Sequence, residues 1–269
     1  MTLPFVKMHA HGDDFIIIDR RGQDDPITAQ VARCLGNRHT GIGFNQLAVV
    51  LDCADAAARI KFWNPNGTPL EACGSATRGV ADRLMQETGT DSIVLRTERG
   101  LLTCVRVAGQ RVSVNMGAPS LDWAAVPLAE PLDTRTLPIS GSPAACSMGN
   151  PHCTFFVEDI AAVDVEALGP ALEVHPIFPA RTNVHFVQVL DRRHIRLRIW
   201  ERGGGVPLGS GSCCCGAVVN GIRRGLLDDT VEVHCDGGTL TVQWDGQGGV
   251  LLTGRVEPIM QGTVYAIPV

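Results

Sequence analysis

No stretch of this 269-residue sequence is apolar over the length that a helix needs to cross a bilayer. The N-terminal residues MTLPFVKMHAHGDD also lack the apolar core of a signal peptide. These absences predict a cytoplasmic protein without a membrane partner. The length is enough for one large domain or two medium-sized domains, each with a core of its own.

The sequence also has little that would hold a nucleic acid or a nucleotide. Its net charge is −5 and no basic run is longer than a few residues, whereas phosphate-binding surfaces are basic. Neither a GxGxxG nor a Walker pattern occurs, and the short Gly41-Ile42-Gly43 is weak evidence by itself. We therefore expect no nucleic-acid partner, and nucleotide binding has no support.

Metal-ligand spacing is missing as well. Ten cysteines are present, but no CxxC pair has a matching partner. Cys213, Cys214 and Cys215 are adjacent and would point in different directions from a helix. Because cytoplasmic thiols are kept reduced, we expect mostly free cysteines. The sequence therefore predicts neither a disulfide framework nor a metal site.

What the sequence does contain is a cysteine at the expected start of a helix. Cys73 stands directly before Gly74-Ser75-Ala76, and Val80, Leu84 and Met85 then share one helical face. Free N–H groups and the positive end of the helix dipole gather at such a start. They lower the pKa of a thiol and can bind a carboxylate, so Cys73 is a candidate base. The alternative is a buried structural cysteine in a turn.

A similar segment occurs in the second half of the chain. Residues 208–225 read LGSGSCCCGAVVNGIRRG, a small-residue turn followed by an apolar helical run. Ser210-Gly211-Ser212 stands in register with Cys73-Gly74-Ser75. Two such segments suggest an internal duplication, with a ligand site between two domains.

Short strand patterns with glycine turns predict a β-rich domain around one helix in each half. Pro119 to Ser142 is rich in proline and small residues and contains the expected junction. Gln261 to Val269 is expected to return to the first domain. The predicted division is 1–118 plus 258–269 for the domain with Cys73, and 119–257 for the domain with Ser210.

Polar loops after predicted strands are candidate binding elements. His11-Gly12-Asp13-Asp14 lies between two strand-like runs, and Asn64-Pro65-Asn66-Gly67 is a strong turn signal after a strand. Glu201-Arg202 follows another strand shortly before Ser210. A solvated turn is the alternative for the first loop, and a weak surface ion pair for the last.

Six motifs, in the same order, resemble those of the diaminopimelate epimerase family. They are Lys7-Met8-His9; Arg38-His39-Thr40-Gly41-Ile42-Gly43 followed by Gln46; Ala72-Cys73-Gly74 with Arg78 behind it; Met148-Gly149-Asn150-Pro151-His152; Arg181-Thr182-Asn183; and Trp200-Glu201-Arg202-Gly203. The resemblance covers nearly the whole chain. It implies an α/β (α+β) fold of two pseudo-symmetric domains, each a barrel-like sheet around a central helix. It also implies no pyridoxal phosphate, no metal and no other cofactor.

The resemblance further implies a reaction and the residues that perform it. One cysteine removes the α-hydrogen of an amino acid, and a second returns a proton from the opposite face. Helix-start N–H groups stabilise the charge that develops, and closure of the domains excludes water. By position, the α-carboxylate would be held by Gly74, Ser75, Gly211 and Ser212. The far end of the substrate would be read by Asn64, Asn150, Asn183, Glu201 and Arg202, while Gln46 and His152 would line the site.

Ser210 departs from this pattern, because it stands where the family has its second cysteine. A serine hydroxyl is a much weaker acid than a thiol. Three interpretations of Ser210 stay open. It is an engineered replacement of a cysteine, or it is a native residue in an asymmetric pair in which Cys73 is the strong base. In the third, the two-base reaction has given way to a related elimination or isomerisation. Cys213, which replaces a family glycine, is a further alternative as acid or base. The surroundings, with Val206-Pro207 in place of glutamate-threonine, favour native divergence.

Asp13 and Asn45 depart as well, since the family has an asparagine and an aspartate there. A carboxylate at position 13 favours a cationic group on the substrate. A solvated Asp13 that touches nothing is the alternative.

We therefore predict an isomerase, a cofactor-independent racemase or epimerase for diaminopimelate or a related polar or basic amino acid. Cys73 and Ser210 form the predicted catalytic pair. The expected partner is a small-molecule amino acid, and a homodimer is a candidate assembly. The alternative is a divergent relative that performs one-base isomerisation or elimination, or that binds an amino acid without catalysis.

Overall fold

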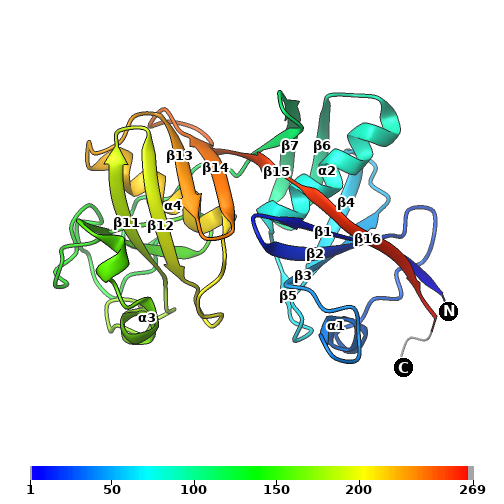
Figure 1. Cartoon of the computed structure of the whole chain (residues 1–269), viewed down its shortest axis with the longest axis horizontal. Helices are drawn as coiled ribbons and strands as arrows, with labels where there is room; N and C mark the ends of the chain where they lie inside the picture. The colour runs from blue at the N-terminus through cyan, green and yellow to red at the C-terminus, as the bar shows by residue number, and fades with distance from the viewer. Residues whose placement is uncertain (1, 266–269) are drawn as a thin grey trace. The chain divides into compact units, whose positions relative to one another are not determined.

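The computed structural model describes residues 2–265, and the chain divides into two compact units (Figure 1). Unit 1 comprises Met1–Asn115 and Gly254–Val269, and unit 2 comprises Met116–Thr253. These borders lie a few residues from the predicted ones at 118 and 257. Of the segment 261–269 assigned to the first domain, residues 266–269 lie outside the described part.

Unit 1 is a sheet that surrounds one helix. Its strand order is β16-β1-β2-β3-β4-β6-β7-β8, with the short β5 paired to β4. Helix α2 (Gly74–Thr88) packs against β1, β2, β3, β6, β7 and β8, so the sheet curves around it. The strands are β1 (Leu3–Ala10), β2 (Asp13–Asp19), β3 (Gln46–Leu51), β4 (Ala58–Trp63), β5 (Pro69–Leu70), β6 (Ser92–Thr97), β7 (Gly100–Val107), β8 (Arg111–Asn115) and β16 (Glu257–Val264), and the second helix is α1 (Ala29–Gly36).

Unit 2 repeats this plan. Its strand order is β15-β14-β13-β12-β11-β10-β9, and helix α4 (Gly211–Arg223) packs against β9, β10, β11, β12 and β14. The strands are β9 (Ala144–Ser147), β10 (Pro151–Val157), β11 (Asn183–Asp191), β12 (His194–Trp200), β13 (Thr230–Cys235), β14 (Gly238–Gln243) and β15 (Leu251–Arg255). A 3₁₀ turn (Ile160–Ala162) and α3 (Val165–Glu173) complete it. The predicted α+β class is confirmed.

Matching positions in the two units are 137 residues apart. Cys73 and Ser210 both precede the central helix, with similar backbone angles of φ −143°, ψ 109° and φ −148°, ψ 123°. Trp63 and Trp200 both end a strand that pairs with the strand before it. Register pairs also match, since Phe15 lies opposite Gln46 and His152 opposite Asn183 across parallel strands. The internal duplication is therefore visible in the backbone as well as in the sequence.

A packing detail supports the same correspondence. A Cβ added at Gly79 of α2 would lie 2.4 Å from the Phe15 ring, and one added at Gly216 of α4 would lie 2.8 Å from the His152 ring. Each glycine stands six positions after the residue that caps its helix. In each unit a ring from the strand therefore packs directly against the helix backbone at a glycine.

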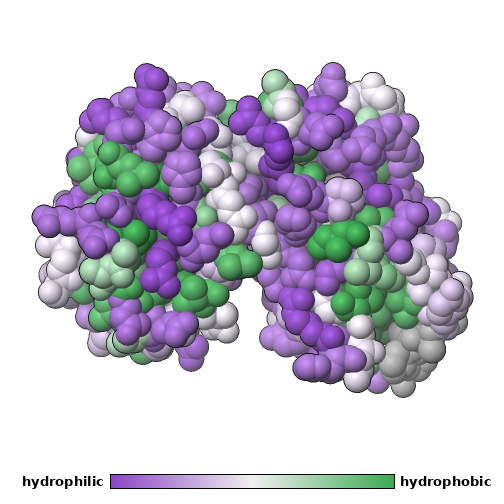
Figure 2. Space-filling view, viewed as in Figure 1, coloured by the Kyte–Doolittle hydropathy of each residue, from purple (hydrophilic) through white to green (hydrophobic). Residues whose placement is uncertain are grey.

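Among residues 2–265, no helix is both long enough and apolar enough to cross a bilayer. On the face drawn in Figure 2, hydrophobic residues occur in separate small groups on a largely hydrophilic surface. Exposed large apolar side chains include Leu101 of β7, Leu190 of β11 and Leu208, which lies between β12 and α4.

Candidate active site

Cys73 is the N-cap of α2, as the sequence predicts. Its backbone is extended, and the Ala76 N–H donates to Sγ at 3.4 Å, so the sulfur satisfies one of the free donors of the first turn. The hairpin of β4 and β5 leads directly into this cap. Part of the residue is exposed, and its sulfur lies beside the N–H groups that begin the helix.

The predicted lowering of the Cys73 pKa is wrong. Burial raises the pKa of the thiol to about 12, and the charge of Asp13 adds to this effect. The Ala76 N–H and the Arg78 guanidinium act in the opposite direction but do not outweigh burial. The free protein therefore holds Cys73 as a protonated thiol at neutral pH.

Asp13 is held close to this thiol by hydrogen bonds. It follows the two-residue turn His11-Gly12, whose φ values of 57° and 77° are those of a tight hairpin. Asn45 Nδ2 donates to Asp13 Oδ1 at 3.0 Å. Burial raises the pKa of the Asp13 carboxyl, against hydrogen bonds from the Asn45 and Ser75 side chains. The alternative of a solvated Asp13 without contacts is wrong.

Gln46 faces the same carboxylate. With its amide nitrogen turned toward Asp13, Gln46 donates to Oδ1 at 3.0 Å and to Oδ2 at 3.3 Å. Asn45 is in turn fixed by Arg38, whose Nη2 donates to Asn45 Oδ1 at 2.8 Å. Arg38 also binds Asp14, at 2.7 Å and 3.0 Å. The turn after β1 and the loop before β3 are therefore locked together at the start of α2.

Asn64 lies in the turn between β4 and β5. Its Nδ2 donates to Thr68 Oγ1 at 3.0 Å, and its backbone N–H donates to the Thr68 carbonyl at 2.9 Å. The side chain thus helps to hold the turn that leads toward Cys73. Among residues 2–265, the hydrogen bonds of the Asn64 side chain go to Thr68 and not to Cys73.

In unit 2, Ser210 caps α4 at the place that Cys73 occupies in unit 1. It is buried, with 9% of its surface exposed, and its side chain makes no capping hydrogen bond. Cys213 is fully buried one turn further on. Burial raises the pKa of Cys213 well above its usual range, and the Glu201 charge adds to this, while side-chain hydrogen bonds from Ser210 and Ser212 lower it. Ser210, Glu201 and Cys213 therefore form one neighbourhood.

Asn183 links two loops with predicted substrate-binding residues at the edge of β10 and β11. Asn183 Nδ2 donates to the Pro151 carbonyl at 3.0 Å, and Asn183 Oδ1 accepts from the Arg202 backbone N–H at 3.0 Å. Asn183 therefore joins the loop of Asn150 to the loop of Glu201-Arg202. The Arg202 guanidinium is exposed and uses Nη1 to bind the Ala180 carbonyl at 3.2 Å.

Glu173, which the sequence does not single out, supports this edge. The buried carboxylate accepts from Trp200 Nε1 at 2.7 Å and from the Gly203 N–H at 3.0 Å. Arg181 also contacts it, at 3.3 Å. Glu173 therefore fixes the turn that carries Glu201 and Arg202.

His152 lies completely inside unit 2. Its Nε2 is 2.9 Å from Asn150 Oδ1, and its Nδ1 is 3.1 Å from Nε2 of His185. Among residues 2–265, His152, His185 and Cys213 are the one group with the ligand types of a transition-metal site, with ligand atoms within 4.8 Å of one another. The hydrogen bonds of these side chains decide whether they are arranged to hold a metal or to bind one another.

The sequence pattern of the family described as Diaminopimelate epimerase matches residues 5–121 and 144–259. The chain belongs to the diaminopimelate epimerase family. The diaminopimelate epimerase of Gluconobacter oxydans is 44% identical over 265 residues, which cover 98% of this chain and 99% of the relative. That of Acidiphilium cryptum is 43% identical over 267 residues, covering 98% and 96%. The predicted family and its classification as an isomerase are confirmed.

Solved structures share the fold of this epimerase-family chain at lower identity. A hydroxyproline epimerase from Agrobacterium vitis, with bound trans-4-hydroxy-L-proline, has a TM-score of 0.70 and 15% identity over 99% of this chain and 93% of its own. A phenazine biosynthesis protein from Bacillus anthracis has a TM-score of 0.71 and 18% identity over 99% and 100%. At such identities the likeness shows the fold alone.

The predicted site residues of this diaminopimelate epimerase relative fall into two sets, one in each unit. Unit 1 brings together Asp13, Gln46, Cys73 and Ser75, with Gly74 between the last two, and carries Asn64 in the turn after β4. Unit 2 brings together Asn150, His152, Asn183, Glu201 and Arg202, with Ser210, Gly211 and Ser212 at the start of α4. Sequence reasoning noted Asn45 only as a departure and missed Arg38 and Glu173 as supports.

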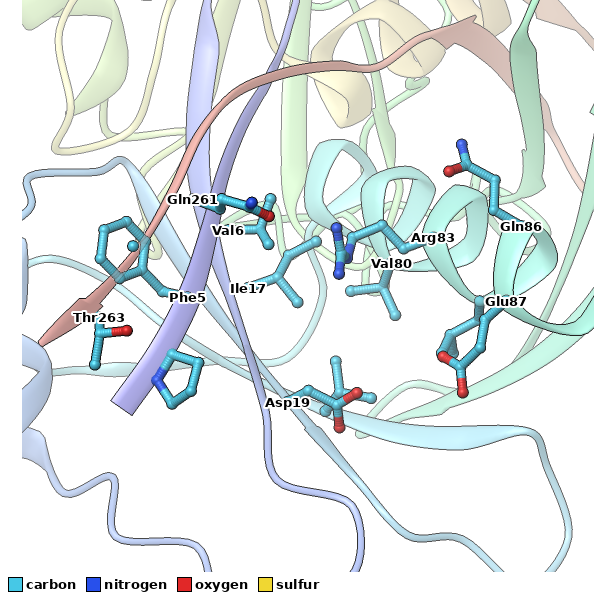
Figure 3. A pocket seen from close by; sticks show the side chains of 14 residues that line it. Phe5, Val6, Ile17, Asp19, Val80, Arg83, Gln86, Glu87, Gln261 and Thr263 are labelled. Atoms are coloured by element: carbon cyan, nitrogen blue, oxygen red, sulfur yellow. The ribbon is translucent and has the colours of Figure 1, made fainter. Parts of the chain in front are cut away.

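One groove on unit 1 lies apart from these residues (Figure 3). It has a volume of about 790 Å³ between α2 and strands β1, β2 and β16. The side chains that line the groove include Phe5, Ile17, Val80 and Gln261. Of the described residues that line it, none is a predicted site residue, so the groove is not part of the candidate site.

Proposed function

We propose that this chain is a cofactor-independent epimerase that removes and returns the α-proton of diaminopimelate or a closely related amino acid. The observation that carries the proposal is the repeated helix start. In each unit the N-cap position of the central helix holds a residue whose side chain is capable of proton transfer, Cys73 in unit 1 and Ser210 in unit 2. We propose that both act on one substrate carbon.

The first N–H groups of α2 and α4 are suited to the α-carboxylate. Gly74-Ser75 and Gly211-Ser212 begin the two helices, where N–H groups have no partner within the helix. A carboxylate bound there becomes a better acceptor of the charge that leaves the α-carbon, which is how such sites stabilise a carbanion. The dipoles of both helices add to this effect.

The polar edge of unit 2 supports a substrate whose far end carries a carboxylate. Asn183 uses its oxygen for the Arg202 N–H, so only its amide nitrogen has a remaining hydrogen to offer. Arg202 can only donate. Glu201, the residue before it, supplies the opposite charge for an ammonium group. The far end of diaminopimelate carries a carboxylate and an ammonium group. The donors of Asn183 and Arg202 match the carboxylate, and Glu201 matches the ammonium group.

Asp13 couples the charge of the substrate to the pKa of Cys73. Its charge contributes to the high pKa of Cys73, so a substrate ammonium that binds Asp13 would neutralise that charge and favour the thiolate. On substrate binding the Cys73 thiol releases its proton to solvent. The thiolate then takes the α-proton, forming an S–H bond, and the electron pair of the broken C–H bond remains on the substrate. In this scheme substrate binding activates the base.

Ser210 makes the two faces unequal. A hydroxyl returns or removes a proton far less readily than a thiol, because its own pKa is much higher. We propose that Cys73 is the strong base and that proton transfer at Ser210 limits inversion. A one-base reaction that exchanges or eliminates without inversion is the competing outcome.

A panel of free amino acids screened for inversion by chiral chromatography tests the proposal. We expect diaminopimelate, or an analogue with a polar far end, to be inverted, and Cys73→Ala to abolish inversion. Calorimetric binding of these amino acids without inversion or α-proton exchange would support a non-catalytic relative instead. Inversion that persists in Cys73→Ala would contradict the proposed base.

A further inference from the structure

A continuous chain of hydrogen bonds crosses the interior of unit 2. Asn220 of α4 donates from Nδ2 to Thr154 Oγ1 at 3.0 Å, and Thr154 Oγ1 is 3.1 Å from His185 Nδ1. His185 Nε2 is 3.1 Å from His152 Nδ1, and His152 Nε2 is 2.9 Å from Asn150 Oδ1. The four interior side chains have no exposed surface, and the chain ends at the partly exposed Asn150.

The first member fixes the direction of this chain. Arg223 Nη1, which can only donate, contacts Asn220 Oδ1 at 3.2 Å, and this turns the Asn220 amide nitrogen toward Thr154. Thr154 accepts that hydrogen and has its own O–H to give to His185 Nδ1. The proton of a neutral His185 then lies on Nε2 and is donated to His152 Nδ1. His152 in turn carries its proton on Nε2 and donates it to Asn150 Oδ1.

The burial of His185 agrees with neutral rings, since it lowers the pKa of His185 to about 3. Every hydrogen of the chain then has one acceptor, and every acceptor has a hydrogen. At the partly exposed end the Asn150 oxygen is occupied, so the Asn150 NH₂ group remains as the donor that can bind another molecule.

At the three strand positions of this chain, unit 1 has apolar residues instead. The positions 137 residues before His152, Thr154 and His185 hold Phe15, Ile17 and Ala48. All three are buried in equivalent strands against the central helix. Buried polar groups cost free energy unless every one is paired, and an apolar set fills the same place in unit 1. The polar set in unit 2 therefore calls for a reason other than folding.

We propose that His185 is a positioning residue that, with Thr154 and Asn220, fixes the tautomer of His152 and thereby turns Asn150 so that it donates to the substrate. Only the role of Asn150 toward a substrate rests on the proposed function. The direction of the chain and the tautomers are properties of the folded protein and are tested without activity.

With the proposed tautomers, this chain is incompatible with a metal at His152, His185 and Cys213. A metal would need bare nitrogens on both facing rings, whereas the chain places a proton between them. The close approach of the two rings is therefore a hydrogen bond from His185 to His152.

Long-range ¹H–¹⁵N spectra of the imidazole rings give the direct test, because they separate protonated from bare ring nitrogens. We expect both His152 and His185 to carry one proton, on Nε2, throughout pH 6 to 9. The variant His185→Ala/Thr154→Ile places the unit 1 side chains of Ala48 and Ile17 at these two positions and should fold. In it the His152 tautomer should become mixed.

Kinetics supply the second readout. If the chain turns Asn150, the double variant should raise KM about tenfold, the equivalent of one weakened donor, with kcat changed less than about threefold. His185→Gln should keep KM near that of the parent protein, because its oxygen can accept from Thr154 while its nitrogen donates to His152.

Three results would overturn the assignment. One is a proton on Nδ1 of either ring in the parent protein. Another is a stoichiometric metal ion that deprotonates both facing nitrogens. The last is a double variant with an unchanged His152 tautomer and an unchanged KM. A chain with the expected tautomers in a protein that inverts no amino acid would leave the positioning intact and contradict the proposed function alone.

Discussion

At the residue scale, two effects oppose each other at Cys73. The helix start favours a thiolate, as the Ala76 N–H at 3.4 Å illustrates, but burial and the Asp13 charge together raise the thiol pKa to about 12. Desolvation therefore outweighs the helix end. A sulfur in this state is a protonated thiol in the free protein, and we propose that a bound cation that offsets the Asp13 charge favours its thiolate form.

Asp13→Asn should therefore make Cys73 more reactive in the free protein. Removing the carboxylate lowers the thiol pKa, so the pH at which Cys73 is alkylated by iodoacetamide shifts downward. Mass spectrometry of the peptide that contains Cys73 follows this site separately from the other nine cysteines. Asp14→Asn is the control, because Asp14 is paired with Lys7 and Arg38 and is not among the groups that shift the Cys73 pKa. An unchanged profile for Asp13→Asn would show that the carboxylate does not act on the thiol.

Ser210→Cys should speed inversion. A thiol in place of the hydroxyl gives the second face an acid whose pKa lies within reach of the reaction, and we expect at least a tenfold rise in the inversion rate. Ser210→Ala should slow inversion while α-proton exchange by Cys73 continues. Equal inversion rates for serine, cysteine and alanine at this position would mean that residue 210 transfers no proton.

At the element scale, each unit is built around one capped helix with a glycine that admits a ring. Gly79 accommodates Phe15 and Gly216 accommodates His152, and an added Cβ would overlap both rings. The two helices therefore set the position of β2 and β10, and with them the turns that carry Asp13 and Asn150. Packing of the helix is in this way coupled to the placement of predicted binding residues.

Gly79→Ala and Gly216→Ala should each lower the free energy of unfolding by about 1–2 kcal/mol, because overpacking exceeds the gain in helix propensity of alanine over glycine. Denaturant titrations measure this. Gly204→Ala is the control, since its Cβ would meet Glu201 at an ordinary 3.4 Å. If alanine at Gly79 and Gly216 is tolerated as well as alanine at Gly204, the rings of Phe15 and His152 do not pack closely on these glycines.

The central helices and their starts could be predicted from sequence. The helix starts at Cys73 and Ser210 follow from small-residue turns before apolar periodicity, and the two segments are visibly alike. The raised pKa of Cys73 could not be predicted, because burial of a sulfur depends on strands far away in sequence. His185 was missed since a lone histidine in the run NVHFVQV reads as part of a strand, and its partners appear only when β10 and β11 pair.

At the scale of the whole molecule, buried thiols are distributed over both units. Burial raises the pKa of Cys104 in unit 1 and of Cys146 in unit 2 to about 12. Thiols in an unfolded chain ionise near pH 8.5, at about the ordinary cysteine pKa. Between about pH 9 and 12 the folded protein therefore retains protons that the unfolded chain has lost.

The contribution of these thiols to the free energy of unfolding should consequently be fully present below about pH 9. As the pH rises toward 12, the free energy of unfolding should fall by about 1.4 kcal/mol per pH unit for each such thiol. Urea titrations under reducing conditions between pH 8 and 10.5 measure the slope. Cys104→Ala and Cys146→Ala should each flatten it, whatever their effect on stability at pH 8. A slope unaffected by both variants would contradict the linkage.

The central claim is that Cys73 removes the α-proton while Ser210 is the weaker partner, and α-deuterium uptake in heavy water tests it most directly. Each stereoisomer of diaminopimelate is followed by mass spectrometry and chiral separation together. We predict deuterium uptake that Cys73→Ala abolishes, and for one stereoisomer uptake into uninverted substrate that outpaces inversion. Exchange in Cys73→Ala at the rate of the parent protein would contradict the account.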